Sequence, residues 1–421
     1  MRFCLITTFF GPHSFGGDAI FVDRLARALL RQGHEVTVVY SVDAFEALRG
    51  DHPLRPYTPP PGLDVRVLRT ARGRLTPLWT HQTGQLGALG AGVRQVLDEG
   101  RFDVIHFHNV SLIGGPQLLT VAPREGRAVK LMTAHEHWLI CPLSSLWTFD
   151  TAVCEQPRCF ACTLAARRPP QLWRSTDALN RALRHLDALI FPSQHTLGVH
   201  RERGIAGTQL LHLPSFLPRD WADPHGSRAV SSTAEEPAAG RPYFAVAGRL
   251  IKAKGIQQLI PLMARLPSVD LKIAGTGPFV AELKRMAAGM HNVHFLGLLD
   301  FPALARLYRE ARALVVPSLL PETFGYVVLE ALSEGTPAIV HHQGALPELI
   351  EASGGGLTYR TVDELAAAME QLLADDELRR FLGARGQAAV ETLWSEERHL
   401  ARYLGMVEEA RSGAGLHVAL P

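Results

Sequence analysis

Short hydrophobic runs alternate with amphipathic stretches along the first half of the chain. Residues 2–9 (RFCLITTF) predict a buried strand, and a glycine-containing loop follows at 11–17. From Asp18 to Gln32 the apolar positions recur with a helical period, and Gly33 ends this predicted helix. Further strands are expected at HEVTVVY (34–40), DVRVLR (64–69), DVIHFH (103–108), AVKLMTA (128–134) and ALIFPS (188–193). This alternation predicts a parallel, doubly wound α/β sheet.

The same alternation starts again after residues 223–242, which are rich in Ser, Pro, Ala and Gly and have no hydrophobic period. A helix is expected through 255–265, and an amphipathic helix at 395–411 is expected to pack back across the domain junction. The strands expected here are YFAVAG (243–248), VDLKIAG (269–275), VHFLG (293–297), ALVVPS (313–318) and PAIVHH (337–342). We therefore predict two Rossmann-like domains that face each other across a cleft.

The predicted domain organisation has four parts. An N-terminal domain spans 1–222 and includes a cysteine-rich insertion at 141–165, and residues 223–242 form a linker. A C-terminal domain spans 243–394, and 395–421 form the returning helix and a tail. Ligands of such sheets bind beyond the carboxyl ends of the strands, so residues at those ends are the first candidates for function.

Composition and charge narrow the class of protein. With 421 residues the chain is too long for one ordinary core, and 47% hydrophobic with 20% charged residues is typical of a globular protein. A net charge of +2 argues against a nucleic-acid partner bound through overall charge. No run approaches the roughly 20 apolar residues of a membrane span, and the N-terminal segment lacks the features of a signal peptide. We expect a cytoplasmic protein, with peripheral contact at the inner face of a membrane left open.

Basic residues follow the first strand of the second domain, in AGRLIKAKG (247–255). Arg249, Lys252 and Lys254 come at the carboxyl end of this strand and before a helix, where cations and free N–H groups bind anions. The alternative is a solvated basic loop. Position at the ligand-binding edge favours the anion site.

Two glutamates lie in PETFGYVVLE (321–330), where a strand gives way to a helix. Glu322 precedes the helix and would act as an ordinary cap if it stood alone. Glu330 lies inside the helix on a stripe that helical periodicity allows to face water. Phe324 and Gly325, at the helix start, would present free backbone N–H groups to a phosphate.

Together these motifs resemble glycosyltransferase family 4, the retaining glycosyltransferases of group 1 with the GT-B fold. The resemblance rests on GRLIKAKG, which is followed some 65 residues later by PSLLPETFGYVVLEALSEGTPAIV. The family's E-x7-E pattern is met by Glu322 and Glu330, and its Arg-x4-Lys pair by Arg249 and Lys254. LKIAGTGP (271–278) and VHFLGLL (293–299) occur in the expected order. The resemblance covers nearly the whole chain.

The resemblance implies a donor site for a nucleotide-diphosphate sugar, with UDP, GDP or ADP as the nucleotide. Arg249 and Lys254 would neutralise the diphosphate as the bond to the sugar breaks, and the backbone near Phe324, Gly325 and Tyr326 would add N–H groups. Stabilisation of developing charge is usually the largest contribution to catalysis.

The same resemblance implies roles for the remaining donor residues. Glu330 would hold the ribose hydroxyls, and Glu322 would hydrogen-bond the transferred sugar. The base would lie near Gly297 and Leu298.

In the N-terminal domain the resemblance assigns donor contacts to three residues. Gly16 and Gly17 would approach the phosphate and the sugar. His135, in LMTAHEHW, aligns with a strand-end histidine that contacts the donor sugar near the reacting carbon, and His137 is a rival. The sequence contains no Asp-x-Asp, which disfavours the glycosyltransferases that hold the diphosphate through a divalent metal ion. No catalytic cofactor is expected.

Four of the five cysteines fall within 141–162. Cys141, Cys154, Cys159 and Cys162 have the spacing C-x12-C-x4-C-x2-C, which fits a structural zinc site that would anchor the insertion. Disulfides and reduced packing cysteines are the alternatives. Similar cysteine-bearing insertions occur in some relatives of the family.

The acceptor is the least determined partner. His106 and His108 end a strand and either touch the acceptor or only pack. RGRLTPLWTHQTGQLGALGAGVRQ (72–95) and ARRPPQLWRS (166–175) mix Arg with Trp and Leu, as membrane-skimming segments do, yet they also fit ordinary surface helices, because no sustained basic amphipathic face emerges.

The predicted function is metal-independent, retaining transfer of a sugar to a hydroxyl acceptor. A GT-B epimerase or hydrolase, and a non-catalytic zinc-stapled binding protein, are the rivals.

Overall fold

The computed structural model describes residues 1–50, 54, 57–123, 127–223 and 240–413. The chain divides into two compact units. The first contains Met1–Ser145, Gln156–Ser215 and His399–Pro421, and the second contains Leu146–Glu155 and Phe216–Arg398. Most of the predicted linker, 224–239, lies outside the described residues. Each unit is built around its own parallel sheet.

The first unit holds a seven-stranded parallel sheet with the order β3-β2-β1-β4-β5-β8-β9. The chain begins in the middle of this sheet, because β1 pairs with β2 on one side and with β4 on the other. Apolar runs such as VVY and ALIF are buried, as expected for central parallel strands. The strands are β1 Arg2–Ile6, β2 Glu35–Ser41, β3 Leu63–Leu68, β4 Val104–Phe107, β5 Val129–Thr133, β8 Ala188–Phe191 and β9 Gln209–His212.

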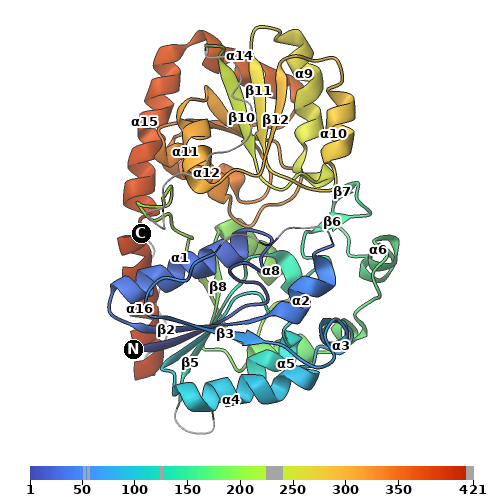
Figure 1. The fold of residues 1–421 in the computed structure, drawn as a ribbon, viewed down its shortest axis with the longest axis vertical. Coiled ribbons are helices and arrows are strands. Elements are labelled where there is room, and N and C mark those ends of the chain that lie inside the picture. Colours follow the sequence, from blue (N-terminus) through green and yellow to red (C-terminus); the bar gives the residue numbers. More distant parts are fainter. Residues whose placement is uncertain (51–53, 55–56, 124–126, 224–239, 414–421) are drawn as a thin grey trace. The chain divides into compact units, whose positions relative to one another are not determined.

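Helices cover both faces of the first sheet, with α1 on one side and α4 and α5 on the other (Figure 1). The predicted helix from Asp18 to Gln32 is confirmed as α1, Gly17–Arg31. The other helices are α2 Val42–Leu48, α3 Leu75–Thr83, α4 Gly90–Gly100, α5 Gly115–Thr120, α6 Cys159–Ala165, α7 Ala178–Leu183 and α8 Gln194–Glu202. Short 3-10 turns are η1 Gly87–Leu89, η2 His137–Leu139 and η3 Leu172–Ser175.

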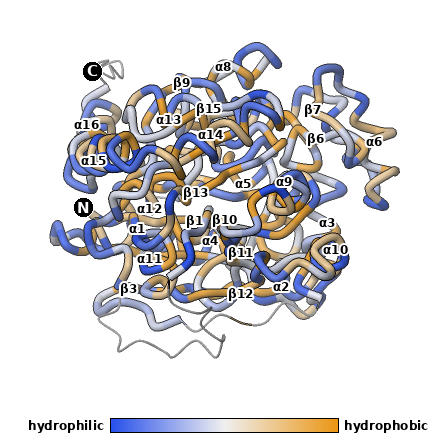
Figure 2. The backbone as a smooth tube through the Cα atoms, turned by 90° about the horizontal axis from the view of Figure 1, so that it is seen from above, coloured by the Kyte–Doolittle hydropathy of each residue, from blue (hydrophilic) through white to orange (hydrophobic). Residues whose placement is uncertain are grey.

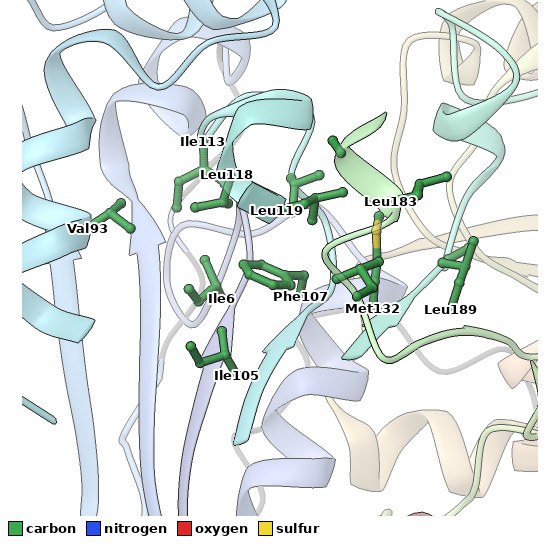
Figure 3. Packing of buried hydrophobic residues seen from close by; sticks show 14 of the residues in the cluster. Ile6, Val93, Ile105, Phe107, Ile113, Leu118, Leu119, Met132, Leu183 and Leu189 are labelled. Atoms are coloured by element: carbon green, nitrogen blue, oxygen red, sulfur yellow. The ribbon is translucent and has the colours of Figure 1, made fainter. Parts of the chain in front are cut away.

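The core on the α4–α5 side joins strands and helices that are distant in the sequence. Ile6 and Phe107 come from neighbouring strands and meet Leu118 and Leu119 of α5 (Figure 3). Each of these side chains is fully buried. Burial of one such side chain contributes about 1.5–3 kcal/mol, so this layer holds the central strand ends rigidly in place.

The second unit holds a six-stranded parallel sheet with the order β12-β11-β10-β13-β14-β15. Alternate residues of β10 and β13 enter two different core clusters, so both faces of the sheet are covered. The strands of both sheets carry mainly hydrophobic positions (Figure 2). The strands are β10 Tyr243–Ala247, β11 Asp270–Ala274, β12 Val293–Gly297, β13 Ala313–Val316, β14 Ala338–His341 and β15 Gly356–Tyr359.

One predicted helix of the second unit differs from the structure. Residues 255–265 do not form one α-helix. Gly255, with φ +74°, lies between the 3-10 turns η4 Lys252–Lys254 and η5 Ile256–Gln258, and the α-helix begins only at Leu259. The helices are α9 Leu259–Arg265, α10 Val280–Met286, α11 Phe301–Arg309, α12 Tyr326–Ser333, α13 Leu346–Ser353, α14 Val362–Ala374 and α15 Asp376–Leu393.

The last helix, α16 Glu396–Ser412, matches the helix predicted at 395–411, and from His399 onward it belongs to the first unit. His399 Nδ1 lies 2.8 Å from the carbonyl oxygen of Pro214, and the Tyr403 hydroxyl lies 2.9 Å from Nδ1 of His106. A small antiparallel hairpin, β6 Trp147–Thr148 and β7 Ala152–Val153, belongs to the second unit although it lies within the cysteine-rich insertion.

In each sheet the strand order changes direction beside the strand that comes first in the sequence. In the first unit the reversal lies between β1 and β4, and in the second it lies between β10 and β13. Ligands of open parallel sheets bind at the carboxyl ends of the strands beside such a point. The loops after β1, β4, β10 and β13 are therefore the places where a site is expected.

Candidate functional site

Two loops at the carboxyl edge of the second sheet are locked together through glycine backbone. Gly248, which directly follows β10, has φ +140°, and the N–H of Leu250 donates to the carbonyl oxygen of Thr276 in the loop after β11, at 2.9 Å. A Cβ atom at Gly275 would overlap the carbonyl oxygen of Gly248. Only glycine permits this approach, and it fixes the backbone that leads to Lys254.

Lys254 and Glu322 come from different strand ends and form an ion pair. Nζ of Lys254 lies 2.5 Å from Oε1 of Glu322, and the hydroxyl of Ser318 donates to the same oxygen at 2.6 Å. The two charged side chains are 29% and 19% exposed, so a ligand can reach them although they are partly desolvated. Charge-assisted hydrogen bonds of this kind are stronger than neutral ones.

A second layer positions Glu322. Ser318 is fully buried at the end of β13, and its carbonyl oxygen lies 2.8 Å from Nδ1 of His341 at the end of β14. Gly344 has φ +66°, and a Cβ atom there would overlap the backbone of Glu322. The N–H of Ala345 donates to the carbonyl oxygen of Glu322 at 2.9 Å. The loop after β14 therefore holds the backbone of Glu322 in place.

The N-terminus of α12 follows Glu322 closely in the sequence, after the loop that leaves β13. Gly325 is the N-cap with φ +127°, and a Cβ atom there would come within 2.9 Å of Leu346. Phe324 is buried and contacts the ring of Tyr326 edge-on, with centroids 5.4 Å apart. Glu330 is only 5% exposed, so the interpretation that it lies on a solvated stripe is wrong. Packing of α12 against the core turns this carboxyl group inward.

Three predicted donor residues, and Lys252 of the same basic loop, lie at the surface. Arg249 is exposed at the end of β10. Lys252 is held by the β6–β7 hairpin, because its Nζ lies 3.1 Å from the carbonyl oxygen of Asp150 and 3.8 Å from a carboxylate oxygen of the same residue. Gly297 has φ +69°, and the side chain of Leu298 is 54% exposed. These residues leave a surface that a ligand can contact.

Three histidines form a row at the strand ends of the first sheet. His106 lies between the Tyr403 hydroxyl and the Thr133 hydroxyl, each 2.9 Å from a ring nitrogen. Its ring is 4.0 Å from that of His108, and Nδ1 of His108 is 3.0 Å from Nε2 of His135. Burial lowers the pKa of His135 to about 3 and holds the pKa of the other two well below the usual value, with a further contribution from the neighbouring histidines. The row is neutral at physiological pH.

The rival histidine takes a different environment. His137 is buried in η2, and its ring stacks on that of His200 at 5.4 Å. His135 instead contacts the ring of Phe21 of α1, with centroids 4.8 Å apart. Of the two, His135 is the one joined to the histidine row.

Beside this row, Asn109 bridges two carboxyl groups. Its Nδ2 donates to Asp18 at 3.1 Å and to Glu136 at 3.4 Å, and the hydroxyl of Thr8 donates to its Oδ1 at 3.0 Å. Burial, and then the charge of Asp18, raise the pKa of Glu136 to about 8. Burial also raises the pKa of Asp18. Glu136 therefore carries a proton at neutral pH and can donate a hydrogen bond.

Family models match both halves of the chain. Residues 15–215 match the model described as Glycosyltransferase Family 4, and residues 229–389 match the model described as Glycosyl transferases group 1. The chain belongs to glycosyltransferase family 4. It is a glycosyltransferase.

Two mannosyltransferases are among the relatives of this glycosyltransferase. One, from Mycobacterium tuberculosis, is a GDP-mannose-dependent alpha-(1-6)-phosphatidylinositol dimannoside mannosyltransferase, 29% identical over 93% of each chain. Another, from Corynebacterium glutamicum, is a GDP-mannose-dependent monoacylated alpha-(1-6)-phosphatidylinositol monomannoside mannosyltransferase. It is 30% identical over 53% of this chain, and the match spans 62% of that relative.

Solved structures share the fold of this glycosyltransferase. Sucrose-phosphate synthase from Thermosynechococcus elongatus superposes with a TM-score of 0.71 at 21% identity, over 98% of this chain and 99% of that one. An Anabaena protein in complex with UDP-glucose superposes with a TM-score of 0.65 at 18% identity, over 98% and 100% of the two chains. The predicted GT-B fold is confirmed.

The cysteines of the insertion are not gathered into a metal site. In the part of the chain that the structure describes, no three His, Cys, Asp or Glu side chains are grouped to hold a metal ion, and no disulfide joins Cys141, Cys154, Cys159 or Cys162. The structure therefore forms no zinc ligand set, and zinc binding stays a prediction. Arg174 instead lies over the rings of Trp138 and Trp173, at 5.1 and 4.6 Å. Burial lowers its pKa to about 10, and the nearby thiols and Glu136 oppose this shift.

Sequence reasoning missed residues in both units of the glycosyltransferase. Ser318 and His341 stand at strand ends, and so do Asn109 and Glu136, so the rule that selected His135 also covers them. Asp18 directly follows the glycine pair. Gly16 has extended backbone, and a Cβ atom there would meet nothing within 4 Å, so the protein itself does not require glycine at this position.

Among the described residues, no helix is long and apolar enough to cross a membrane.

Proposed function

We propose that this glycosyltransferase transfers a sugar from a nucleotide-diphosphate sugar to a hydroxyl acceptor, with retention of configuration and without a divalent metal ion. The observation that carries the proposal is the Lys254–Glu322 pair at 2.5 Å, next in sequence to the N-terminus of α12. It supplies a cation for phosphate and a carboxylate for sugar hydroxyls at one edge of one sheet.

The donor's diphosphate is proposed to bind Lys254, Arg249 and the first N–H groups of α12. Phosphate oxygens would compete with Glu322 for the ammonium group, which frees the carboxylate to accept hydrogen bonds from the sugar. As the glycosidic bond breaks, negative charge grows on the leaving diphosphate, and fixed cations stabilise it without a metal ion. The absence of Asp-x-Asp from the sequence supports the proposal that side-chain cations, and not a metal ion, stabilise the diphosphate.

The remaining donor contacts follow the family pattern. Glu330 is proposed to hold the ribose, and Gly297 with Leu298 to border the base. Gly16 and Gly17 are proposed to contact phosphate and sugar through their backbone. His135 is proposed to contact the transferred sugar as a neutral imidazole, because its low pKa keeps it uncharged.

The acceptor hydroxyl is proposed to attack from the side of the leaving group, with the diphosphate oxygen taking its proton. This front-face path is proposed because no side chain among the described residues is placed as an evident nucleophile. The enzyme is proposed to act in the cytoplasm, since its five cysteines form no disulfide in the structure, as in a reducing compartment.

Donor binding is tested first by thermal shift with GDP-, UDP- and ADP-sugars. A ligand that binds only the native state stabilises it by mass action, and about 100 Kd of the correct donor adds about 2.7 kcal/mol. GDP-mannose and UDP-glucose are the first donors to try, given the relatives and the solved complex. No shift with any nucleotide sugar would contradict the proposal.

Turnover then separates a transferase from its rivals. Lys254→Ala should lower transfer at least about 100-fold. Lys252→Ala removes a cation from the same loop whose partner is Asp150, and should change turnover little. Product formed without acceptor would indicate a hydrolase or an epimerase, and equal loss in both variants would remove the assigned role of Lys254.

A further inference from the structure

Helix α3 exposes its apolar side and buries its polar side. Leu75, Leu78 and Trp79 occupy positions i, i+3 and i+4 of one helix face, and their side chains are 64%, 49% and 48% exposed. The residues buried against the first unit are Thr76, Pro77 and Thr80. A surface helix of a globular protein normally has the opposite arrangement.

Helix α6 and the turn η3 repeat this arrangement. Phe160 and Leu164 lie one helical turn apart on α6 and are 62% and 52% exposed, while Cys162 and Thr163 are buried. Leu172 in η3 is 68% exposed. These six apolar side chains make up nearly half of the large hydrophobic side chains that are exposed in the described chain.

The two helices belong to one surface of the first unit. Nε1 of Trp173 in η3 donates to the carbonyl oxygen of His81 in α3 at 3.1 Å, and α3 and α6 lie on the same side of the unit in both views (Figures 1 and 2). The pKa of His81 is lowered to about 4, first by burial and then by Arg168 and Arg174, so the segment after α6 brings its charge close to α3. We call this surface the α3–α6 face, defined by Leu75, Leu78, Trp79, Phe160, Leu164 and Leu172.

The charges around the α3–α6 face are of one sign. Residues 70–97 and 156–176 contain no Asp or Glu, and Glu155 and Asp177 bound the second segment. Arg69, just before the first segment, is paired with Glu46 at 3.3 Å. The exposed arginines within the two segments are Arg72, Arg74, Arg94, Arg158, Arg167 and Arg168.

We propose that the α3–α6 face binds the surface of an anionic lipid bilayer, with its apolar side chains at the headgroup boundary and the surrounding arginines on lipid phosphates. Exposed Trp, Phe and Leu beside an acid-free set of arginines match an anionic interface, where aromatic rings settle and basic residues gain from the surface potential. The proposal goes beyond sugar transfer and rests on the first unit alone, so it can fail without affecting the proposed reaction.

Vesicle flotation of the purified full-length chain tests the proposal. Vesicles with about one third phosphatidylglycerol in phosphatidylcholine should bind the protein at least tenfold more strongly than pure phosphatidylcholine, and binding should fall as salt is raised to about 0.5 M. Trp79→Gln with Phe160→Gln should lower the partition coefficient at least about tenfold. Arg167→Gln with Arg168→Gln should lower it about 25-fold, since each basic residue near the surface contributes about fivefold.

A matched control comes from the second unit. Phe381 is 55% exposed on α15 next to Arg380, so Phe381→Gln with Arg380→Gln removes one aromatic side chain and one charge at a distant place in the sequence. This variant should bind vesicles like the unmodified protein.

Folding and oligomeric state are read in the same samples. Each variant should keep the unmodified protein's thermal shift with its donor. Absence of binding to anionic vesicles, equal binding to neutral vesicles, or equal loss in the control variant would overturn the proposal. Light scattering that shows a dimer broken by Trp79→Gln with Phe160→Gln would also overturn it, because the face would then be covered by a second copy.

Discussion

The carboxyl edges of the two sheets are built on opposite electrostatic principles. In the second unit the edge holds formal charges in contact, with Lys254 and Glu322 joined at 2.5 Å and both side chains partly exposed. In the first unit the edge holds titratable groups that burial keeps neutral, including His135 with a pKa of about 3 and Glu136 with a pKa of about 8. The two sheets have the same fold, but one edge carries an ion pair, while the other carries mainly neutral hydrogen-bonding groups beside Asp18.

This difference agrees with the proposed chemistry. A leaving diphosphate needs fixed positive charge, while sugar and acceptor hydroxyls are best held by neutral donors and acceptors. A histidine that stays neutral can accept or donate a hydrogen bond without repelling a developing oxocarbenium-like sugar. Apart from the controls, each substitution considered next changes the carboxyl edge of only one of the two sheets.

The largest effect is expected from Glu322→Gln in the second edge. The amide keeps the shape but loses the charge that Lys254 and the Ser318 hydroxyl compensate. We expect kcat/KM for transfer to fall by about 100-fold or more, as when one preorganised group in a polar site is removed. Steady-state kinetics with the donor identified by thermal shift measures it.

Glu334→Gln is the matched control, because Glu334 is also ion-paired in the second unit, to Arg309 at 2.6 Å, but lies at the end of α12 away from the strand ends. Near-normal turnover in both variants would contradict the assigned role of Glu322.

Gly255→Ala is expected to damage the same edge through the backbone. Gly255 has φ +74°, and a Cβ atom there would overlap the carbonyl oxygen of Pro317 at the end of β13. Left-handed strain and this clash together should lower the free energy of unfolding by about 2–4 kcal/mol. Urea denaturation measures it.

Gly289→Ala separates the two causes. Gly289 has φ +81°, but a Cβ atom there would meet nothing within 4 Å, so only the strain of about 1–2 kcal/mol applies. If both variants lose the same amount, the contact with Pro317 has no effect and the loop is looser than the structure indicates.

Sequence reasoning located the strands and therefore both edges. Buried parallel strands read as continuous apolar runs, and β10 and β13 proved to be neighbours, so Lys254 and Glu322 could be placed at one edge. Their contact could not be derived, because it depends on Gly255 and Gly344, whose conformations are set by packing between loops. The Asn109 bridge was missed for a similar reason. Its two carboxyl groups follow β1 and β5, and only the strand order brings them together.

Glu136→Gln tests the neutral character of the first edge through pH. In the unfolded chain this carboxyl group ionises near pH 4.5, but in the folded protein it keeps its proton up to about pH 8. The free energy of unfolding should therefore fall as pH rises through this window. Asp18 strengthens the effect, and Arg168, Arg174 and a hydrogen bond with Ser144 oppose it.

The glutamine variant cannot ionise, so its Tm should fall by roughly 2–4 °C less than that of the unmodified protein between pH 5 and pH 8. Calorimetry at both pH values measures this difference. Glu155→Gln removes an exposed carboxyl group from the cysteine-rich insertion and should leave the dependence unchanged. Identical pH profiles for all three proteins would show that Glu136 is ionised in the folded state.

The smallest effect is expected from Tyr403→Phe. This variant is compared with Tyr359→Phe, because each removes one buried tyrosine hydroxyl group, the former from the first unit and the latter from the second. The Tyr403 hydroxyl is fully buried and lies 2.9 Å from Nδ1 of His106, so its loss leaves a buried ring nitrogen without this partner and should cost about 1–2 kcal/mol. The Tyr359 hydroxyl of the second unit is also buried, yet it has no hydrogen-bond partner among the described residues. Tyr359→Phe should therefore be neutral or slightly stabilising in urea denaturation. Equal losses of stability in the two variants would mean that the contact between Tyr403 of α16 and His106 does not stabilise the histidine row. Burial alone would then keep the histidines neutral.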